Sequence, residues 1–360
     1  MGFTSELKPA TEHGQRPTKA VPLVSVVMCT YNGERFLREA VASILGQTFS
    51  GFELIVVDDG STDRTPQILS ELQARDSRLT VLTNEHNLGI AASTNRGLAA
   101  ARGQYVALQD HDDISLPQRF ETQVDFLNSH PEIALVGSAA TLIDETGAAY
   151  ENYVEVADDL DIKWESLFRC PISHTSVMVR REVAAEVGGY ALDPVLKVAS
   201  DYDLLSRIAM RYRVVNLRRA LVKWRRHDRA SSVTWRQDQL EACAIISRRN
   251  VETVLSRGHD LSPSHREAFA GARAFACTPA GLMPTLPAAQ VISGLAFLCN
   301  LLEEFSRTYA PPKKLRRRLS WVWGKHAVAL SLRSSWDFRS RMRIFILGIR
   351  CLVTFSGEDR

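Results

Sequence analysis

The chain reads YVALQDHDD at residues 105–113, a short apolar run followed at once by three carboxylates within four residues. Carboxylates crowded at the end of a buried strand repel one another unless a cation neutralises them. Hard oxygen ligands of this kind suit Mg²⁺ or Mn²⁺. The stretch therefore predicts a divalent-metal site at the end of a strand.

A calcium loop is the competing interpretation, because Asp110, Asp112 and Glu121 fall at EF-hand positions one, three and twelve. Ile114 and Ser115 stand at positions five and six, where that loop needs a ligand and a glycine. The EF-hand interpretation is therefore rejected.

Two upstream segments have the same layout. The apolar run 24–28 leads into residues 29–33, and the run 54–57 leads into Asp58, Asp59, Gly60 and Ser61. In open α/β sheets the ligand crevice lies outside the carboxyl ends of the strands. We therefore expect the three polar clusters to converge on one site.

From Pro22 to about Gly137, short apolar strands alternate with amphipathic helices, which is typical of βαβ units around a mostly parallel sheet. The first helix is expected over residues 36–45 with an exit at Gly46, and the second begins with Thr65 as cap and Pro66. Further strands are expected at 81–82, 133–143 and 175–179, and further helices up to residue 98 and over 120–127.

The composition is that of a globular protein. The 360 residues include 45% hydrophobic and 24% charged residues, which excludes disordered and fibrous classes, and a net charge of +3 implies no partner by itself. Six scattered cysteines without a CxxC pair, and an opening without a signal peptide, favour a reducing cytoplasm. We expect a disordered leader at 1–20, an α/β domain at 21–235 and a helical, Arg-rich region at 236–360.

The C-terminal region is basic. Residues 311–350 carry eleven Lys or Arg against one Asp, interleaved with aromatic side chains. This composition suits an anionic membrane surface, although a solvated helical face is the plainer alternative. Nucleic acid is not an expected partner. The uncharged run 274–302 is interrupted by prolines, and its continuous part 288–302 is too short to span a bilayer.

Five short motifs occur in an order and spacing that closely resemble family 2 glycosyltransferases, and the resemblance covers roughly residues 22 to 235. It implies a GT-A fold, a nucleotide-diphosphate sugar donor, a divalent cation and inversion at the anomeric carbon. The motifs are Thr30-Tyr31-Asn32, Gln47-Thr48-Phe49, residues 57–63, Asn87-Leu88-Gly89 and residues 110–113.

The same resemblance assigns the donor-binding residues. Tyr31 would lie against the nucleobase, the backbone of Thr30 would contact its edge, and Asp59 would accept a hydrogen bond from the imide of uracil or thymine. Taken alone, Tyr31 would be a strand-end packing residue. The segment 58–61 would then be a turn that caps the next helix.

In the DxD element the resemblance gives Asp110 to the ribose and Asp112 to the metal, with Asp113 assisting. His227, in a late His-x-x-x-Ser element, would approach the metal or the diphosphate, and His174 is a further candidate. For both histidines the alternative is a structural core residue.

Asp201 aligns with the base that takes the proton from the acceptor hydroxyl. Many relatives have Glu-Asp here, whereas this chain has Ser200-Asp201, so the acidic neighbour is missing. Ser200 is also expected to cap the following helix and to form a capping box with Asp203, the reserve candidate for the base.

The sequence therefore predicts a cytoplasmic, peripherally membrane-associated, metal-dependent inverting enzyme. It would add one sugar to a growing surface glycan, on a lipid carrier. A Gln-x-x-Arg-Trp motif and spanning helices, typical of processive synthases, are not found. The alternative from another class is a binding module of the same fold that has lost turnover.

Overall fold

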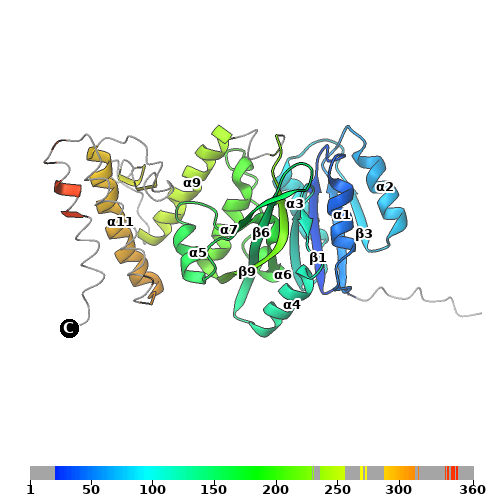
Figure 1. The fold of residues 1–360 in the computed structure, drawn as a ribbon, viewed down its shortest axis with the longest axis horizontal. Coiled ribbons are helices and arrows are strands. Elements are labelled where there is room, and N and C mark those ends of the chain that lie inside the picture. The colour runs from blue at the N-terminus through cyan, green and yellow to red at the C-terminus, as the bar shows by residue number, and fades with distance from the viewer. Residues whose placement is uncertain are drawn as a thin grey trace, which may run out of the picture.

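The computed structural model describes residues 21–228, 230, 236–255 and 288–312, with short pieces between 268 and 347. Its centre is a nine-stranded sheet in which β3, β2, β1 and β4 lie side by side and parallel (Figure 1). The strands are β1 (Val24–Thr30), β2 (Phe52–Asp58), β3 (Leu79–Thr83) and β4 (Tyr105–Asp110), connected by α1 (Leu37–Leu45), α2 (Thr65–Arg75) and α3 (Ile90–Ala100).

The other half of the sheet is mixed. After β4 the order continues β8-β6-β9-β5, and β7 pairs with β6. β8 is antiparallel to both β4 and β6, whereas β9 is parallel to β6. The bounds are β5 (Ile114–Ser115), β6 (Ile133–Ile143), β7 (Ala149–Tyr153), β8 (Met178–Arg180) and β9 (Arg213–Arg225). The expected α/β class is confirmed, with parallel strands in one half of the sheet and mixed parallel and antiparallel pairs in the other.

Helices cover both faces of the sheet, because successive residues of a buried strand point to opposite sides. Val26 packs in the core shared with α1, α2 and α4 (Arg119–Ser129), and its neighbour Val27 packs in the core on the opposite face. That second core is shared with α3, α5 (Asp159–Glu165), α6 (Arg181–Glu186) and α7 (Ser200–Arg211).

Two long helices, α9 (Arg236–Leu255) and α11 (Ala288–Tyr309), follow the sheet and share a third core with α5 (Figure 1). In this core the rings of Trp164 and Phe305 meet edge to face, with centroids 5.1 Å apart. Among the described helices, none has the length and apolar character that crossing a bilayer requires. The predicted leader 1–20 and most of the basic segment 311–350 lie outside the described residues.

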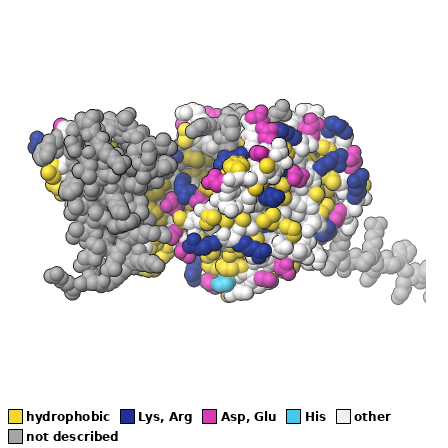
Figure 2. Space-filling view, in the orientation of Figure 1, with side chains coloured by type: hydrophobic (Ala, Val, Ile, Leu, Met, Phe, Trp, Pro, Cys, Tyr) yellow, Lys and Arg dark blue, Asp and Glu magenta, His cyan; other side chains and the backbone are white. Residues whose placement is uncertain are grey.

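Charges are mixed over the face in view. Figure 2 shows basic and acidic side chains interspersed on the α/β part. A nucleic-acid-binding face would instead gather Lys and Arg along one stripe. That no nucleic acid is bound stays a prediction.

Three local expectations are wrong. Residues 174–176 form a 3₁₀ turn (η1), so the strand expected at 175–179 begins only at Met178. Thr65 is already inside α2, and its hydroxyl accepts from Gly33 N at 2.9 Å instead of capping the helix. Ser200 is likewise inside α7, and no side chain caps that helix. At Thr65 a contact with another segment replaces the expected helix cap. At Ser200 the helix begins before the residue that was expected to cap it.

One of the described cysteines differs from expectation. Cys29, Cys170 and Cys243 are free. Cys299 is disulfide-bonded, which the cysteine spacing did not predict. The cytoplasmic location stays a prediction.

Arg119 is fully buried beneath the end of β4. Its guanidinium donates to the carbonyls of Leu108 and Val177 at 2.9 and 3.0 Å, and to Gln109 Oε1 and Ser115 Oγ at 2.8 Å each. Burial lowers the pKa of Arg119 to about 9, although the negative charges of Asp110 and Asp113 oppose this. This one side chain therefore fixes the strand end that carries the carboxylates.

We expect Arg119→Leu to lower the free energy of unfolding by about 3 kcal/mol, because several buried acceptors lose their donor. Urea denaturation measures the effect as a lower midpoint at unchanged slope. Arg75→Leu, on the exposed end of α2, is the matched control and should change stability by less than about 0.5 kcal/mol. Equal midpoints for Arg119→Leu and the wild type would contradict this account.

Candidate active site

The carboxyl ends of β1, β2 and β4 meet at one edge of the sheet. In the strand register Thr30 lies opposite Asp58, and Cys29 lies opposite Asp110. The expected convergence of the three polar clusters is confirmed. It follows from the right-handed connections through α1, α2 and α3, which keep β1, β2 and β4 parallel.

The loops after β1 and β2 are tied together. Asn32 adopts φ 49°, its backbone N donates to Ser61 Oγ at 2.9 Å, and its Oδ1 accepts from Thr62 N at 2.9 Å. Tyr31, at the start of this turn, is 44% exposed. Thr30 is buried, and its carbonyl accepts from Asp59 N at 2.9 Å. The turn thus leaves an aromatic side chain open to solvent at the site.

Asp59 is buried and already holds a loop. Its Oδ1 accepts from Asn84 Nδ2, Ser93 Oγ and Leu88 N at 2.7 to 2.8 Å, and its Oδ2 accepts from Gly89 N at 2.9 Å. These bonds explain in physical terms why Asp59 and the Asn87-Leu88-Gly89 motif occur together. Oδ2, with one of these four bonds, has the greater remaining capacity to accept.

Each aspartate of the DxD element faces its own histidine. Asp110 Oδ1 lies 2.8 Å from His174 Nδ1, and Asp112 Oδ2 lies 2.9 Å from His227 Nε2. Burial alone would raise the pKa of Asp112, but the His227 hydrogen bond and the charges of His111 and His227 outweigh it and lower that pKa. Asp112 is therefore ionised at neutral pH.

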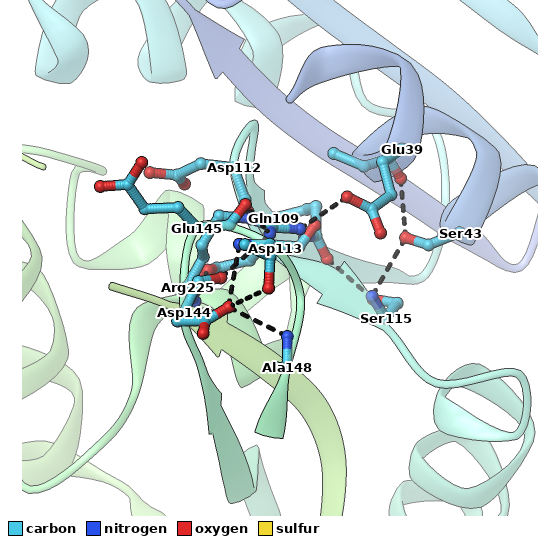
Figure 3. Close-up of polar contacts among 12 residues, drawn as sticks. Glu39, Ser43, Gln109, Asp112, Asp113, Ser115, Asp144, Glu145, Ala148 and Arg225 are labelled. Atoms are coloured by element: carbon cyan, nitrogen blue, oxygen red, sulfur yellow. Dashed lines mark hydrogen bonds and ion pairs between the residues drawn. The ribbon is translucent and has the colours of Figure 1, made fainter. Parts of the chain in front are cut away.

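Asp113 points away from this pair, into the protein. Its Oδ1 accepts from Arg225 N at 2.8 Å, and burial, followed by the charges of Asp112 and Asp110, raises its pKa well above the usual value. The Arg225 side chain donates to the carbonyls of Asp112 and Glu145 at 2.9 and 3.1 Å. Figure 3 shows Arg225 among these partners, with the Asp112 and Glu145 carboxylates on the same side. Asp113 thus anchors the loop from within.

Asp201 and Asp203 occupy the first turn of α7 but differ in their partners. Asp203 is completely buried and forms ion pairs with Arg207, at 2.7 Å, and with Arg249 of α9. Asp201 is half-buried, and within the described part of the chain no cation forms an ion pair with it. Burial raises the pKa of Asp201, and the charge of His174 opposes that effect. The capping box expected for Asp203 is replaced by its two arginines.

The comparisons with known proteins agree with this arrangement. A family model described as Glycosyl transferase family 2 matches residues 25–188. The chain is also 33% identical over 244 residues to an uncharacterized glycosyltransferase of Haemophilus influenzae, a match that covers 66% of this chain and 75% of the relative. The chain belongs to glycosyltransferase family 2. A further relative, the amylovoran biosynthesis glycosyltransferase AmsE of Erwinia amylovora, is 31% identical over 206 residues, 56% of this chain and 76% of AmsE.

Two solved structures share the fold of this family 2 chain. TarS 1-349 of S. aureus, crystallised in complex with UDP, superposes with a TM-score of 0.52 at 18% identity, over 92% of this chain and 91% of TarS. The mannosyltransferase PcManGT of Pyrobaculum calidifontis, in complex with GDP-Man and Mn²⁺, gives 0.51 at 20% identity, over 95% and 89%. At these identities the likeness concerns the fold alone.

Sequence reasoning on this family 2 chain missed the residues that support the carboxylates. Arg119 and Arg225 are buried cations that fix the DxD loop, and Tyr190 lies 2.6 Å from His174 Nε2. An arginine inside an apolar helix pattern, such as Arg119 beside Phe120, is a usable signal. Arg225 and Tyr190 carry no local signal, because their partners are distant in sequence.

Proposed function

We propose that this family 2 glycosyltransferase is metal-dependent and inverting. It moves one sugar from a nucleotide-diphosphate sugar, with uridine or thymidine favoured, to a hydroxyl of a growing surface glycan. The observation that carries the proposal is the pair of carboxylate–histidine contacts at the end of β4. The carboxylate of Asp201, which forms no ion pair among the described residues, interacts electrostatically with His174 of one of these pairs.

The residues present fit a divalent cation between protein and substrate. Asp112 Oδ2 and His227 Nε2 face each other at 2.9 Å, so that one hard oxygen and one imidazole nitrogen are available together. Among the described residues no group of three or more such side chains surrounds one point. Mg²⁺ and Mn²⁺ sites with one or two protein ligands take their remaining ligands from substrate phosphates and water. When bound, the ion would neutralise charge on the departing diphosphate.

The donor would be held by residues from three strand ends. Tyr31 offers an exposed aromatic ring for the nucleobase, with the backbone of Thr30 at its edge, and Asp59 Oδ2 retains a lone pair for the base imide. Asp110 is fixed on the His174 side through Oδ1, which leaves Oδ2 for the ribose hydroxyls. These roles place the sugar phosphates over Asp112.

Asp201 would take the proton from the acceptor hydroxyl as that oxygen attacks the anomeric carbon opposite the leaving group. Only the ionised carboxylate can do this. The raised pKa of Asp201 brings its basicity closer to the working pH, which improves proton transfer in the transition state. The missing acidic neighbour at Ser200 does not remove this capacity.

The surface-glycan assignment is supported by relatives. AmsE is named for amylovoran biosynthesis, and TuaG of Bacillus subtilis, 31% identical over 166 residues, is named as a putative teichuronic acid biosynthesis glycosyltransferase. A lipid-linked acceptor and membrane contact through residues 311–350 stay predictions. The inactive binding module is the second candidate, and its one supporting feature is the departure at Ser200.

Thermal melting with UDP, dTDP, GDP and CMP, each with Mn²⁺ and with EDTA, tests the proposal. One nucleotide should raise the melting temperature, and only with metal, because a ligand at 100 times its Kd stabilises the fold by about 2.7 kcal/mol. Stabilisation that is equal in EDTA would contradict metal dependence. Binding without any release of nucleotide from the matching sugar donors would favour the binding module.

A further inference from the structure

We propose that Gln109 is a positioning residue of the metal site. Its side-chain amide binds two backbone carbonyls of the loop that carries the DxD carboxylates, and this fixes the direction in which Asp112 faces the cation. The proposal rests on the metal role proposed for Asp112. It assigns part of the metal affinity to a neutral side chain that does not touch the ion.

The amide nitrogen of Gln109 faces the loop. Gln109 directly precedes Asp110 and is only 1% exposed. Its Nε2 donates to Asp110 O and to Asp113 O, each at 3.0 Å. Asp113 N also donates to Asp110 O, at 3.4 Å, so residues 110–113 form one turn. The amide therefore closes this turn from the interior of the protein.

The amide oxygen of Gln109 faces the opposite way and fixes the orientation of the whole group. Oε1 accepts from Ser115 Oγ at 2.7 Å and from the Arg119 guanidinium at 2.8 Å. A guanidinium only donates and a carbonyl only accepts. Exchanging the amide oxygen and nitrogen would set donor against donor at Arg119 and acceptor against acceptor at both loop carbonyls. All four hydrogen-bonding positions of the amide are thus used, each by a partner of the right kind.

These partners require a glutamine. A glutamate has the same length and would pair with Arg119, but it would turn an oxygen without a proton toward the two loop carbonyls. A methionine matches the length and lacks the strong donor and acceptor of the amide. Buried carbonyls that lose their donor destabilise the conformation that buries them. We therefore expect either substitution to move the turn until its carbonyls reach water.

The turn at 110–113 decides where the metal-binding carboxylate points. The carbonyl of Asp112, inside this turn, is held by Arg225 Nε at 2.9 Å, and its carboxylate lies 2.9 Å from His227 Nε2. In Figure 3 the Asp112 carboxylate points away from Gln109. The interior side chains hold the backbone of the turn and leave the carboxylate for the ion. Metal ligands depend on such outer hydrogen bonds for their affinity.

Nucleotide affinity in Gln109→Glu tests the proposal. The probe is whichever of UDP, dTDP, GDP and CMP stabilises the wild type with Mn²⁺, and calorimetric titration measures its Kd. We expect the Kd in Mn²⁺ to rise by about 10- to 100-fold, the range for a lost outer hydrogen-bond partner. The melting shift in EDTA should not change. An added negative charge by itself would attract the cation and lower the Kd. A Kd in Mn²⁺ equal to or below that of the wild type would therefore overturn the proposal.

Two further variants separate positioning from stability. Gln109→Met removes both donors without adding charge, and it repeats the test if the glutamate variant does not fold. Ser115→Ala is the matched control, because it removes one partner of Oε1 and leaves both Nε2 bonds in place. It should lower the urea midpoint and leave the Kd in Mn²⁺ at the wild-type level. An equal loss of affinity in Ser115→Ala and Gln109→Met would reduce Gln109 to a structural residue.

The role of Gln109 and the proposed function fail in different ways. If no nucleotide stabilises the wild type more with Mn²⁺ than with EDTA, metal dependence falls and the role of Gln109 falls with it. If Asp112→Ala loses the metal-dependent melting shift while both Gln109 variants keep the wild-type Kd, only the role of Gln109 is overturned.

Discussion

Asp201→Asn is expected to lower kcat by about 10²- to 10⁴-fold, the range that a positioned general base contributes. Nucleotide affinity should stay at the wild-type level, because the role proposed for this carboxylate is at the acceptor and not at the donor. Single-turnover transfer rates and the metal-dependent melting shift measure the two effects separately.

Asp203→Asn is the matched control, two residues along the same helix. Its carboxylate is completely buried between Arg207 and Arg249, so its removal should lower the free energy of unfolding by about 3 kcal/mol or more through the unpaired arginines. In the folded fraction, kcat should be close to that of the wild type. A comparable loss of kcat in folded Asp203→Asn would make Asp203 the base instead.

The pH dependence follows from the direction of the Asp201 shift. The base works only when ionised, and burial raises its pKa above the usual aspartate value. Activity should therefore be present above this raised pKa and fall as the pH drops through it. An acid limb at or below the pKa of an ordinary aspartate would contradict a base whose pKa is raised.

Asp112→Ala has the second large expected effect, the loss of metal-dependent nucleotide binding. The Asp112 carboxylate and the His227 imidazole are the two side chains proposed to bind the metal together. Removing the carboxylate leaves only the imidazole of this pair for the ion. We expect the nucleotide melting shift in Mn²⁺ to fall to the value in EDTA, with an affinity loss of about 100-fold or more.

Glu145→Gln is the control for charge alone. Figure 3 shows the Glu145 carboxylate on the same side of the loop as Asp112, and its ion pair is with Arg35 at the surface. Metal-dependent binding should persist in this variant. Equal loss of nucleotide binding in Asp112→Ala and Asp201→Asn would contradict the division between donor and base residues.

The sequence predicted the elements whose information is local. Short continuous apolar runs located β1, β2 and β4, and helical spacing located α1 down to its exit at Gly46. The motifs at the ends of these strands then pointed to glycosyltransferase family 2 and to the edge of the sheet where the candidate site lies. β9, the strand that leads to Arg225 and His227, was not predicted, because its apolar alternation is broken by Arg218 and Arg219 at a register shift.

Side-chain partners were harder to predict because they depend on long-range contacts. Asp59 was assigned to the nucleobase, and the structure shows it also holding Asn84, Ser93 and the Leu88–Gly89 backbone. Asp203 was matched to a capping box, and its partners are two arginines, one of them on α9. Local patterns describe what a residue can do, whereas the fold decides which partner reaches it.

The anomeric configuration of the first-formed product tests the central claim most directly. NMR of the sugar transferred from the donor that melting selects would record it at early time points. A single displacement assisted by Asp201 predicts the configuration opposite to that of the donor. A product with retained configuration would contradict the account, because a single displacement assisted by a base cannot retain the configuration.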